Sequence, residues 1–248
     1  KESQIKTFLI NMNFGKKLKD IQNELSPMFL KQGNVFECSN FINKTKNIFK
    51  NEDCIIFTCG PSFGEHDIAY LLEQSKNKVV FCVKQTVNEL KDVCDVHFFN
   101  CSNLPTKDYQ YNKNTFSIAS SNYPINYRIS GFSYQDFFMQ VPLIEQIGGK
   151  ENTIAFKKNF DDFLLSKTLS RNVGPGIMLE TVLYFAVHFG VKSITTVGWD
   201  LDGHNSHYYK DEVKNKGCEI PWDMELNRKA KKDIEIWLKN KGIELKSL

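Results

Sequence analysis

The sequence lacks the long apolar run that a membrane-spanning helix requires. No uninterrupted stretch reaches the roughly 18 apolar residues of a transmembrane candidate, and no signal-peptide core stands near the start. The net charge is also small, at +3, which favours neither a nucleic-acid partner nor a strongly acidic one. We therefore expect a cytoplasmic protein without nucleic-acid binding, and peripheral contact with a membrane surface stays open.

Several metal and nucleotide motifs are missing as well. None of the seven cysteines forms a C-x-x-C pair, so a zinc ribbon or a dithiol redox motif is not expected. The zinc spacing H-E-x-x-H, the dinucleotide fingerprint G-x-G-x-x-G and the Walker P-loop do not occur. Cys54 and Cys82 lie inside apolar runs, which is typical of buried free thiols. The missing motifs therefore argue against a dedicated zinc site, although a divalent ion is compatible with the sequence.

Short apolar runs alternate with helical patterns along most of the chain. The runs are rich in β-branched residues and lack polar alternation, which predicts parallel strands covered by helices on both faces. Strands are predicted at 54–59, 78–83, 96–99, 115–119, 193–197 and 243–245. Helices are predicted at 67–74, 87–91, 177–189 and 225–240. This order predicts an α/β fold with a doubly wound, Rossmann-like and mostly parallel sheet.

The domain organisation follows from the same pattern. Residues 1–50 are rich in Lys and Asn and predict a peripheral helical segment, with helices near 16–25 and 40–50. We expect residues 51–248 to form a single Rossmann-like domain. Within it, residues 120–170 are less regular and rich in aromatic side chains, which fits either a lid over a binding site or a peripheral apolar layer.

Polar residues follow three of the predicted strands at the point where each strand ends. They are Cys59-Gly60-Pro61-Ser62 after the first strand, Lys84 and Gln85 after the second, and Asn100 after the third. The Gly-Pro loop precedes a helix, and such loops present backbone N–H groups to phosphate. Because ligands of doubly wound sheets bind at the carboxyl ends of strands, we expect these residues to line a nucleotide or phosphate site.

Two later segments add candidates for binding and catalysis. Asn172, Gly174 and Gly176 open the helix at 177–189, where free N–H groups and the helix dipole favour an anion. The segment 198–211 holds Asp200, Asp202, His207, Tyr208 and further polar residues just after a strand. Either aspartate is suited to a metal ion or to base catalysis, and His207 to general-base catalysis near neutral pH.

Taken in order, these pieces resemble the bacterial lipooligosaccharide sialyltransferases. That family has Gly-Asn-Gly-Pro-Ser-Leu where this chain has Thr58-Cys59-Gly60-Pro61-Ser62-Phe63. Its next strands end in Cys-Asn-Gln and Phe-Tyr-Asn, matched here by Val83-Lys84-Gln85 and Phe98-Phe99-Asn100. A later Gly-Ile-Asp corresponds to Gly198-Trp199-Asp200, and a tyrosine about eight residues on corresponds to Tyr208. The chain also resembles the related domain of motility-associated flagellin glycosylation factors and of archaeal pterin pyrophosphokinases.

The resemblance implies a variant of the GT-A fold and a site for a CMP-activated acidic sugar, without an obligatory metal. In the family, the strand-end positions and the helix start hold the nucleotide, tyrosines assist phosphate departure, and a histidine deprotonates the glycan acceptor. Here Cys59 and Lys84 replace two family asparagines, Asp202 stands where a tyrosine is expected, and Glu225 near the family histidine. His207 is then an alternative base.

Three functions stay open on these grounds. The first is a glycosyltransferase that moves sialic acid, Kdo or a related sugar from a CMP-sugar to a glycan. The second is a pyrophosphate-transferring enzyme like the pterin branch, which needs ATP, Mg²⁺ and clustered carboxylates, for which Asp200 and Asp202 are candidates. The third is a non-catalytic module that binds a nucleotide-sugar.

Overall fold

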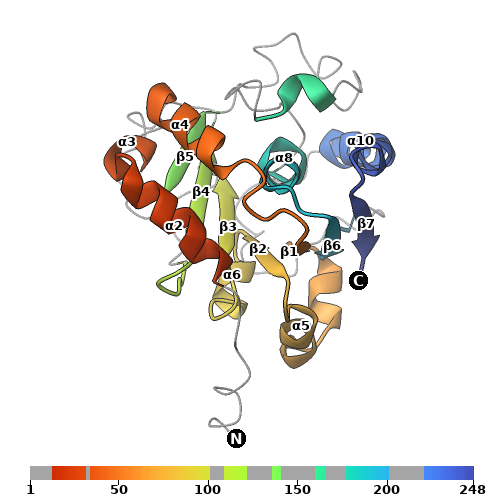
Figure 1. Cartoon of the computed structure of the whole chain (residues 1–248). Helices are drawn as coiled ribbons and strands as arrows, with labels where there is room; N and C mark the ends of the chain where they lie inside the picture. Colours follow the sequence, from red (N-terminus) through yellow and green to blue (C-terminus); the bar gives the residue numbers. More distant parts are fainter. Residues whose placement is uncertain are drawn as a thin grey trace, which may run out of the picture.

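The protein is built on one parallel sheet of seven strands. The computed structural model describes residues 13–31, 34–100, 109–121, 136–140, 160–165, 177–200 and 221–248. The strands run in the order β5-β4-β3-β2-β1-β6-β7, and every neighbouring pair is parallel (Figure 1). Their bounds are β1 (Asp53–Phe57), β2 (Val79–Val83), β3 (Val96–Asn100), β4 (Phe116–Ser121), β5 (Phe137–Gln140), β6 (Ser193–Val197) and β7 (Glu244–Ser247). The predicted α/β fold with a Rossmann-like parallel sheet is confirmed.

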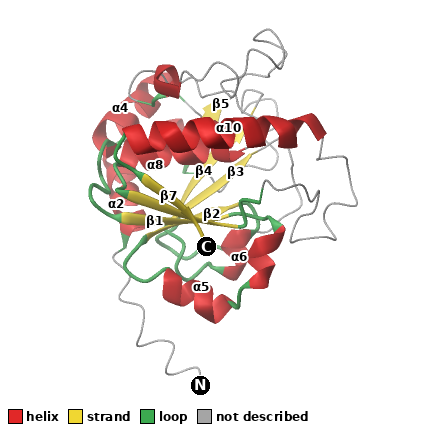
Figure 2. Cartoon of the chain, turned by 90° about the vertical axis from the view of Figure 1, so that its right-hand side faces the viewer, coloured by secondary structure: helices red, strands yellow, loops and turns green. Residues whose placement is uncertain are grey.

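Helices cover both faces of the sheet, which makes it doubly wound. The helices are α2 (Phe14–Glu24), α3 (Pro27–Lys31), α4 (Val35–Thr45), α5 (Ile68–Gln74), α6 (Thr86–Glu89), α8 (Leu183–Phe189) and α10 (Pro221–Asn240). Figure 2 shows α4, α8 and α10 on one side of the strands and α5 and α6 on the other. Short 3₁₀ turns occur at η1 (Pro61–Glu65) and η7 (Phe160–Phe163), and the π-helical turn η8 (Met178–Val182) leads into α8.

The apolar runs form strands because both of their faces are buried. In β2 every residue is buried. Alternate residues divide between two clusters: Ile56 and Phe81 pack toward α8 and α10, whereas Phe57 and Cys82 pack toward α5 and α6. Such a strand has no solvent face and therefore shows no polar alternation.

The N-terminal helices share the main core with the sheet. Phe41 of α4 is completely buried, and its ring stacks on that of Phe116 with 5.2 Å between centroids and lies 5.0 Å from that of Phe137. Phe14 and Phe49 meet edge to face at 5.3 Å in the same cluster. The described part of the predicted N-terminal segment is thus a layer packed directly on β4 and β5.

Several element predictions differ from the structure. The helix α3 was not predicted, the strand predicted at 54–59 ends at Phe57, and the helix predicted at 225–240 begins at Pro221. The helix predicted at 40–50 is α4, which begins at Val35 because the Asn34 side chain caps it, and which gives way after Thr45 to a turn that Asn47 enters with φ +60°. The irregular segment predicted at 120–170 contains β5, one of the two edge strands of the sheet. The predicted aromatic lid falls largely outside the described residues.

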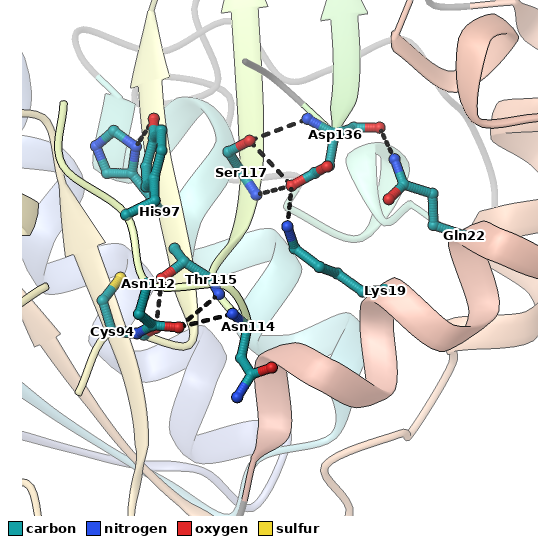
Figure 3. A network of polar contacts seen from close by, with 10 residues as sticks. Lys19, Gln22, Cys94, His97, Asn112, Asn114, Thr115, Ser117 and Asp136 are labelled. Atoms are coloured by element: carbon teal, nitrogen blue, oxygen red, sulfur yellow. Dashed lines mark hydrogen bonds and ion pairs between the residues drawn. The ribbon is translucent and has the colours of Figure 1, made fainter. Parts of the chain in front are cut away.

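Asp136 forms hydrogen bonds that join β4, β5 and α2 at the amino ends of the strands. Asp136, just before β5, accepts hydrogen bonds at its carboxylate from the Ser117 N–H (2.9 Å) and hydroxyl (3.1 Å) of β4. Its backbone carbonyl accepts from Gln22 of α2 at 2.8 Å, and Lys19 lies 3.6 Å from its carboxylate (Figure 3). These bonds fix β5 to β4 and α2 to both strands.

Candidate functional site

The carboxyl ends of β1 and β6 meet where the strand order reverses. The chain moves outward in one direction from β1 to β5 and then returns to place β6 on the other side of β1. Beyond the two strands, the Thr58 N–H donates to the Val197 carbonyl at 2.8 Å, and the Gly60 N–H donates to the Gly198 carbonyl at 2.9 Å. The predicted Gly-Pro loop therefore lies against the predicted Gly-Trp-Asp segment, at the switch point where doubly wound sheets bind ligands.

Glycine is required at both contact points. A Cβ atom on Gly60 would lie 2.1 Å from the Gly198 carbonyl oxygen and 2.5 Å from a carboxylate oxygen of Asp200. Gly198 has φ +77°, and a Cβ there would lie 2.3 Å from the Thr58 carbonyl oxygen. The close approach that Gly60 permits is thus to the neighbouring loop of the protein itself, whereas the sequence predicts an approach to a ligand.

The same loops are joined by Ser62 and Asp200. The Ser62 N–H donates to the Asp200 carboxylate at 2.8 Å, and the Gly198 N–H donates to the Ser62 hydroxyl at 3.1 Å. The Phe63 N–H bonds the Gly60 carbonyl at 3.1 Å. The sequence predicted free N–H groups in this loop, but those of Gly60, Ser62 and Phe63 already have acceptors. A phosphate at this point would have to displace the Asp200 carboxylate to reach the Ser62 N–H.

Lys84 leaves β2 in a left-handed backbone conformation. Its φ is +54°, which costs a residue with a side chain about 1–2 kcal/mol. Its N–H donates to the Phe98 carbonyl of β3 at 2.8 Å. No carboxylate in the described part of the chain pairs with the half-buried Lys84 side chain. Strained backbone of this kind clusters at binding and active sites.

Cys59 and Thr86 join the carboxyl end of β1 to that of β2 through hydrogen bonds. Cys59 is only 4% exposed, and its thiol lies 3.3 Å from both the Val83 carbonyl and the Gln85 side-chain oxygen. The Thr86 hydroxyl lies 3.1 Å from the Phe57 carbonyl and 3.0 Å from that of Val83. Cys59, predicted as a ligand residue, is turned toward the protein in this structure.

His97 holds Lys84 in place, and sequence reasoning missed it. Because a carbonyl can only accept, the His97 Nε2–H donates to the Lys84 carbonyl at 2.8 Å, which leaves Nδ1 to accept from the Tyr111 hydroxyl at 2.9 Å. Burial lowers the pKa of His97 to about 3, only partly offset by the Lys84 carbonyl, so the ring is neutral at physiological pH. The sequence did contain a signal for this role, because His97 is a titratable residue among the apolar side chains of β3.

The remaining predicted residues are placed only in part. Asn100 ends β3 and Glu225 lies in α10, but their side chains are outside the described residues. Asn172, Gly174, Gly176, Asp202, His207 and Tyr208 lie outside the described part altogether. The π-helical turn η8 follows directly on the predicted anion cradle, and such turns are frequent at functional sites.

The described residues form neither a cluster of metal ligands nor a membrane-spanning helix. Within the described ranges, no group of three or more His, Cys, Asp or Glu side chains is arranged to hold a metal ion. Every helix in that part of the chain is too short or too polar to cross a lipid bilayer.

Comparison with models of known protein families and with curated protein sequences finds no match to this chain. The resemblance to the sialyltransferases therefore depends on the order of the motifs quoted above.

Proposed function

We propose that the protein is a glycosyltransferase that moves an acidic sugar, such as sialic acid or Kdo, from a CMP-sugar to a glycan. One observation carries the proposal: predicted site residues that follow β1, β2 and β6 lie beside one another at the switch point of a parallel sheet. They are the loop 59–62, Lys84 with Gln85, and Asp200. In doubly wound sheets, nucleotides bind in the crevice outside the carboxyl ends of the strands, at the switch point.

Lys84 supports an anionic donor. A CMP-sugar of this kind carries a phosphate and a carboxylate, and either can pair with a lysine that has no carboxylate partner among the described residues. His97 and the Phe98 carbonyl hold the Lys84 backbone, so the ammonium group is presented from a rigid turn. Preorganisation of this sort reduces the entropy lost on binding.

The proposed reaction is a direct displacement at the anomeric carbon. A base, His207 or Glu225 with Asp223 nearby, takes the proton of the acceptor hydroxyl. The acceptor oxygen then attacks the sugar with inversion, and CMP leaves with the bonding electron pair. Tyr208 donates to the departing phosphate, whereas Asn100, Asn172, Gly174 and Gly176 hold the nucleotide. No metal is obligatory in this scheme.

Calorimetric titration with CMP, UMP, GMP and ADP tests the binding step. We expect CMP to bind more tightly than the others. We expect Lys84→Ala to weaken CMP binding about 10- to 100-fold, because one charge-assisted hydrogen bond is lost. Lys78→Ala is the matched control, since Lys78 lies at the amino end of β2 and Lys84 lies at its carboxyl end.

The outcomes separate the competing functions. Equal or absent binding of all four nucleotides would overturn the proposal. CMP binding without transfer from any CMP-sugar would leave a non-catalytic binding module. Magnesium-dependent release of AMP from ATP in the presence of a pterin would identify the pyrophosphokinase alternative.

A further inference from the structure

Four large apolar side chains are exposed together at one corner of the molecule. They are Met28 and Phe29 of α3 and Val35 and Phe36 of α4, with exposed fractions of 60%, 43%, 72% and 71%. We call this group the apolar tip. Among the described residues only six large hydrophobic side chains are exposed, and four of them fall within the nine residues of the tip segment, 28–36. Such clustering marks an interaction surface.

The fold fixes the tip in its exposed position. The Asn34 N–H donates to the Phe29 carbonyl at 2.9 Å, which brings the end of α3 beside the start of α4. Asn34 also caps α4 through its side chain, at 3.1 Å from the Phe36 N–H and 3.2 Å from the Glu37 N–H. Leu30 and Cys38 are buried on the inner faces of the two helices. With those residues anchored in the core, the tip residues point outward.

The tip lies in a basic part of the chain. Residues 13–50 contain seven lysines and three acidic residues, a net charge of +4 in a chain whose total is +3. The rest of the chain therefore sums to −1. Figure 1 shows α2, α3 and α4 along one side of the molecule, far from α10 and β7. Apolar side chains that project from a basic layer are suited to a lipid bilayer, which has an apolar interior and, where its lipids are anionic, a negatively charged surface.

We propose that the apolar tip inserts into the interfacial region of an anionic lipid bilayer and holds the protein at a membrane surface. Phe36, Phe29, Val35 and Met28 enter the boundary between headgroups and acyl chains, while the exposed lysines of residues 13–50 remain in the headgroup layer. This contact is peripheral, and it does not depend on the glycosyltransferase proposal.

Vesicle sedimentation with the full chain tests the proposal. Vesicles of phosphatidylcholine alone are compared with an equal mixture of phosphatidylcholine and phosphatidylglycerol. We expect preferential binding to the anionic vesicles that weakens as salt is raised, because screening reduces the attraction. The double substitution Val35→Ser, Phe36→Ser should reduce the partition constant by about 100-fold, roughly 10-fold for each apolar side chain withdrawn from the lipid.

Ile236→Ser provides the matched control. Ile236 is an apolar side chain on α10 that is 52% exposed, and its substitution should leave vesicle binding unchanged. Thermal unfolding of all variants should match the parent, since the substituted side chains are exposed. Failure of the parent chain to bind anionic vesicles, or an equal loss in Ile236→Ser, would overturn the proposal. Self-association in sedimentation velocity that Val35→Ser, Phe36→Ser abolishes would assign the tip to a second copy instead.

Discussion

At the scale of single residues, the switch point is organised by contacts within the protein. Gly60, Ser62 and Asp200 bind the loop after β1 to the loop after β6, and Cys59 binds it to the end of β2. The strained backbone of Lys84 is held by a buried neutral histidine. The site is therefore rigid before any ligand arrives, which suits recognition more than large rearrangement.

Gly60→Ala should lower the free energy of unfolding by about 1–3 kcal/mol. Its φ of −73° suits alanine, so the cost comes from forcing a methyl group against the Gly198 carbonyl, as in an overpacked core. Urea unfolding monitored by fluorescence measures the change, and nucleotide titration should show weaker binding because the two loops are forced apart.

Gly242→Ala separates steric crowding from backbone strain. Gly242 has φ +75°, and a Cβ there meets nothing within 4 Å. The substitution should cost about 1–2 kcal/mol of backbone strain and leave nucleotide binding unchanged. Equal effects of both substitutions on binding would argue against a specific role for the Gly60 contact.

At the scale of elements, α2 is capped by a residue from a distant part of the chain. Asn13 makes no side-chain cap. Instead the Asp95 carboxylate, just before β3, accepts from the Gly15 N–H at 3.2 Å and from the Val80 N–H of β2 at 3.0 Å. Gly15 is needed because a Cβ there would lie 2.2 Å from the Asn114 carbonyl oxygen. The helix end and the sheet edge are thus joined through one buried carboxyl group.

Asp95→Ala should lower the free energy of unfolding by about 1–3 kcal/mol and speed hydrogen exchange in the first turn of α2. Burial raises the pKa of Asp95 to about 7, partly offset by the N–H groups of Val80, Gly15 and Phe14. The folded state therefore binds this proton more tightly than the unfolded state does. As pH rises from about 4 to about 7, the parent protein loses the stability that comes from the protonated Asp95 side chain. The variant lacks this side chain and therefore does not show this loss.

The destabilisation caused by Asp95→Ala should accordingly be largest near pH 4 and shrink toward pH 7. Urea unfolding across this range measures it. Asp92→Ala is the control, because Asp92 is exposed three residues earlier. If the free energy of unfolding lost in Asp95→Ala grew with pH, this would contradict the raised pKa of Asp95.

The elements divide into those that sequence predicts well and those that it does not. The sequence predicts β1 and β2 well because strands buried on both faces form nearly unbroken apolar runs. β5 was missed because it is a four-residue edge strand in an aromatic-rich stretch, and its pairing depends on Asp136 and Ser117. The role of His97 could not be predicted either, since it depends on a carbonyl contributed by another strand end.

At the scale of the whole molecule, the N-terminal helices and the sheet form one core. Phe41→Ala should lower the free energy of unfolding by about 3–5 kcal/mol, because a fully buried ring that contacts Phe116 and Phe137 is removed. Phe36→Ala, the same change on the exposed side of the same helix, should stay within about 0.5 kcal/mol of the parent.

A single cooperative urea transition is expected for the parent and for both variants. Two transitions, with Phe41→Ala affecting only the first, would instead mean that the N-terminal layer unfolds independently of the sheet.

The fold class can be predicted from the amino-acid pattern, because strands buried on both faces and crossover helices each leave a local apolar pattern. The same pattern locates the strand ends where ligand residues are expected. The contacts of those residues are known only from the three-dimensional structure: Gly60 lies against Gly198, Ser62 bonds Asp200, and His97 bonds Lys84. These contacts join positions up to 138 residues apart. A pattern along the chain records burial, but it does not record which distant donor meets which acceptor.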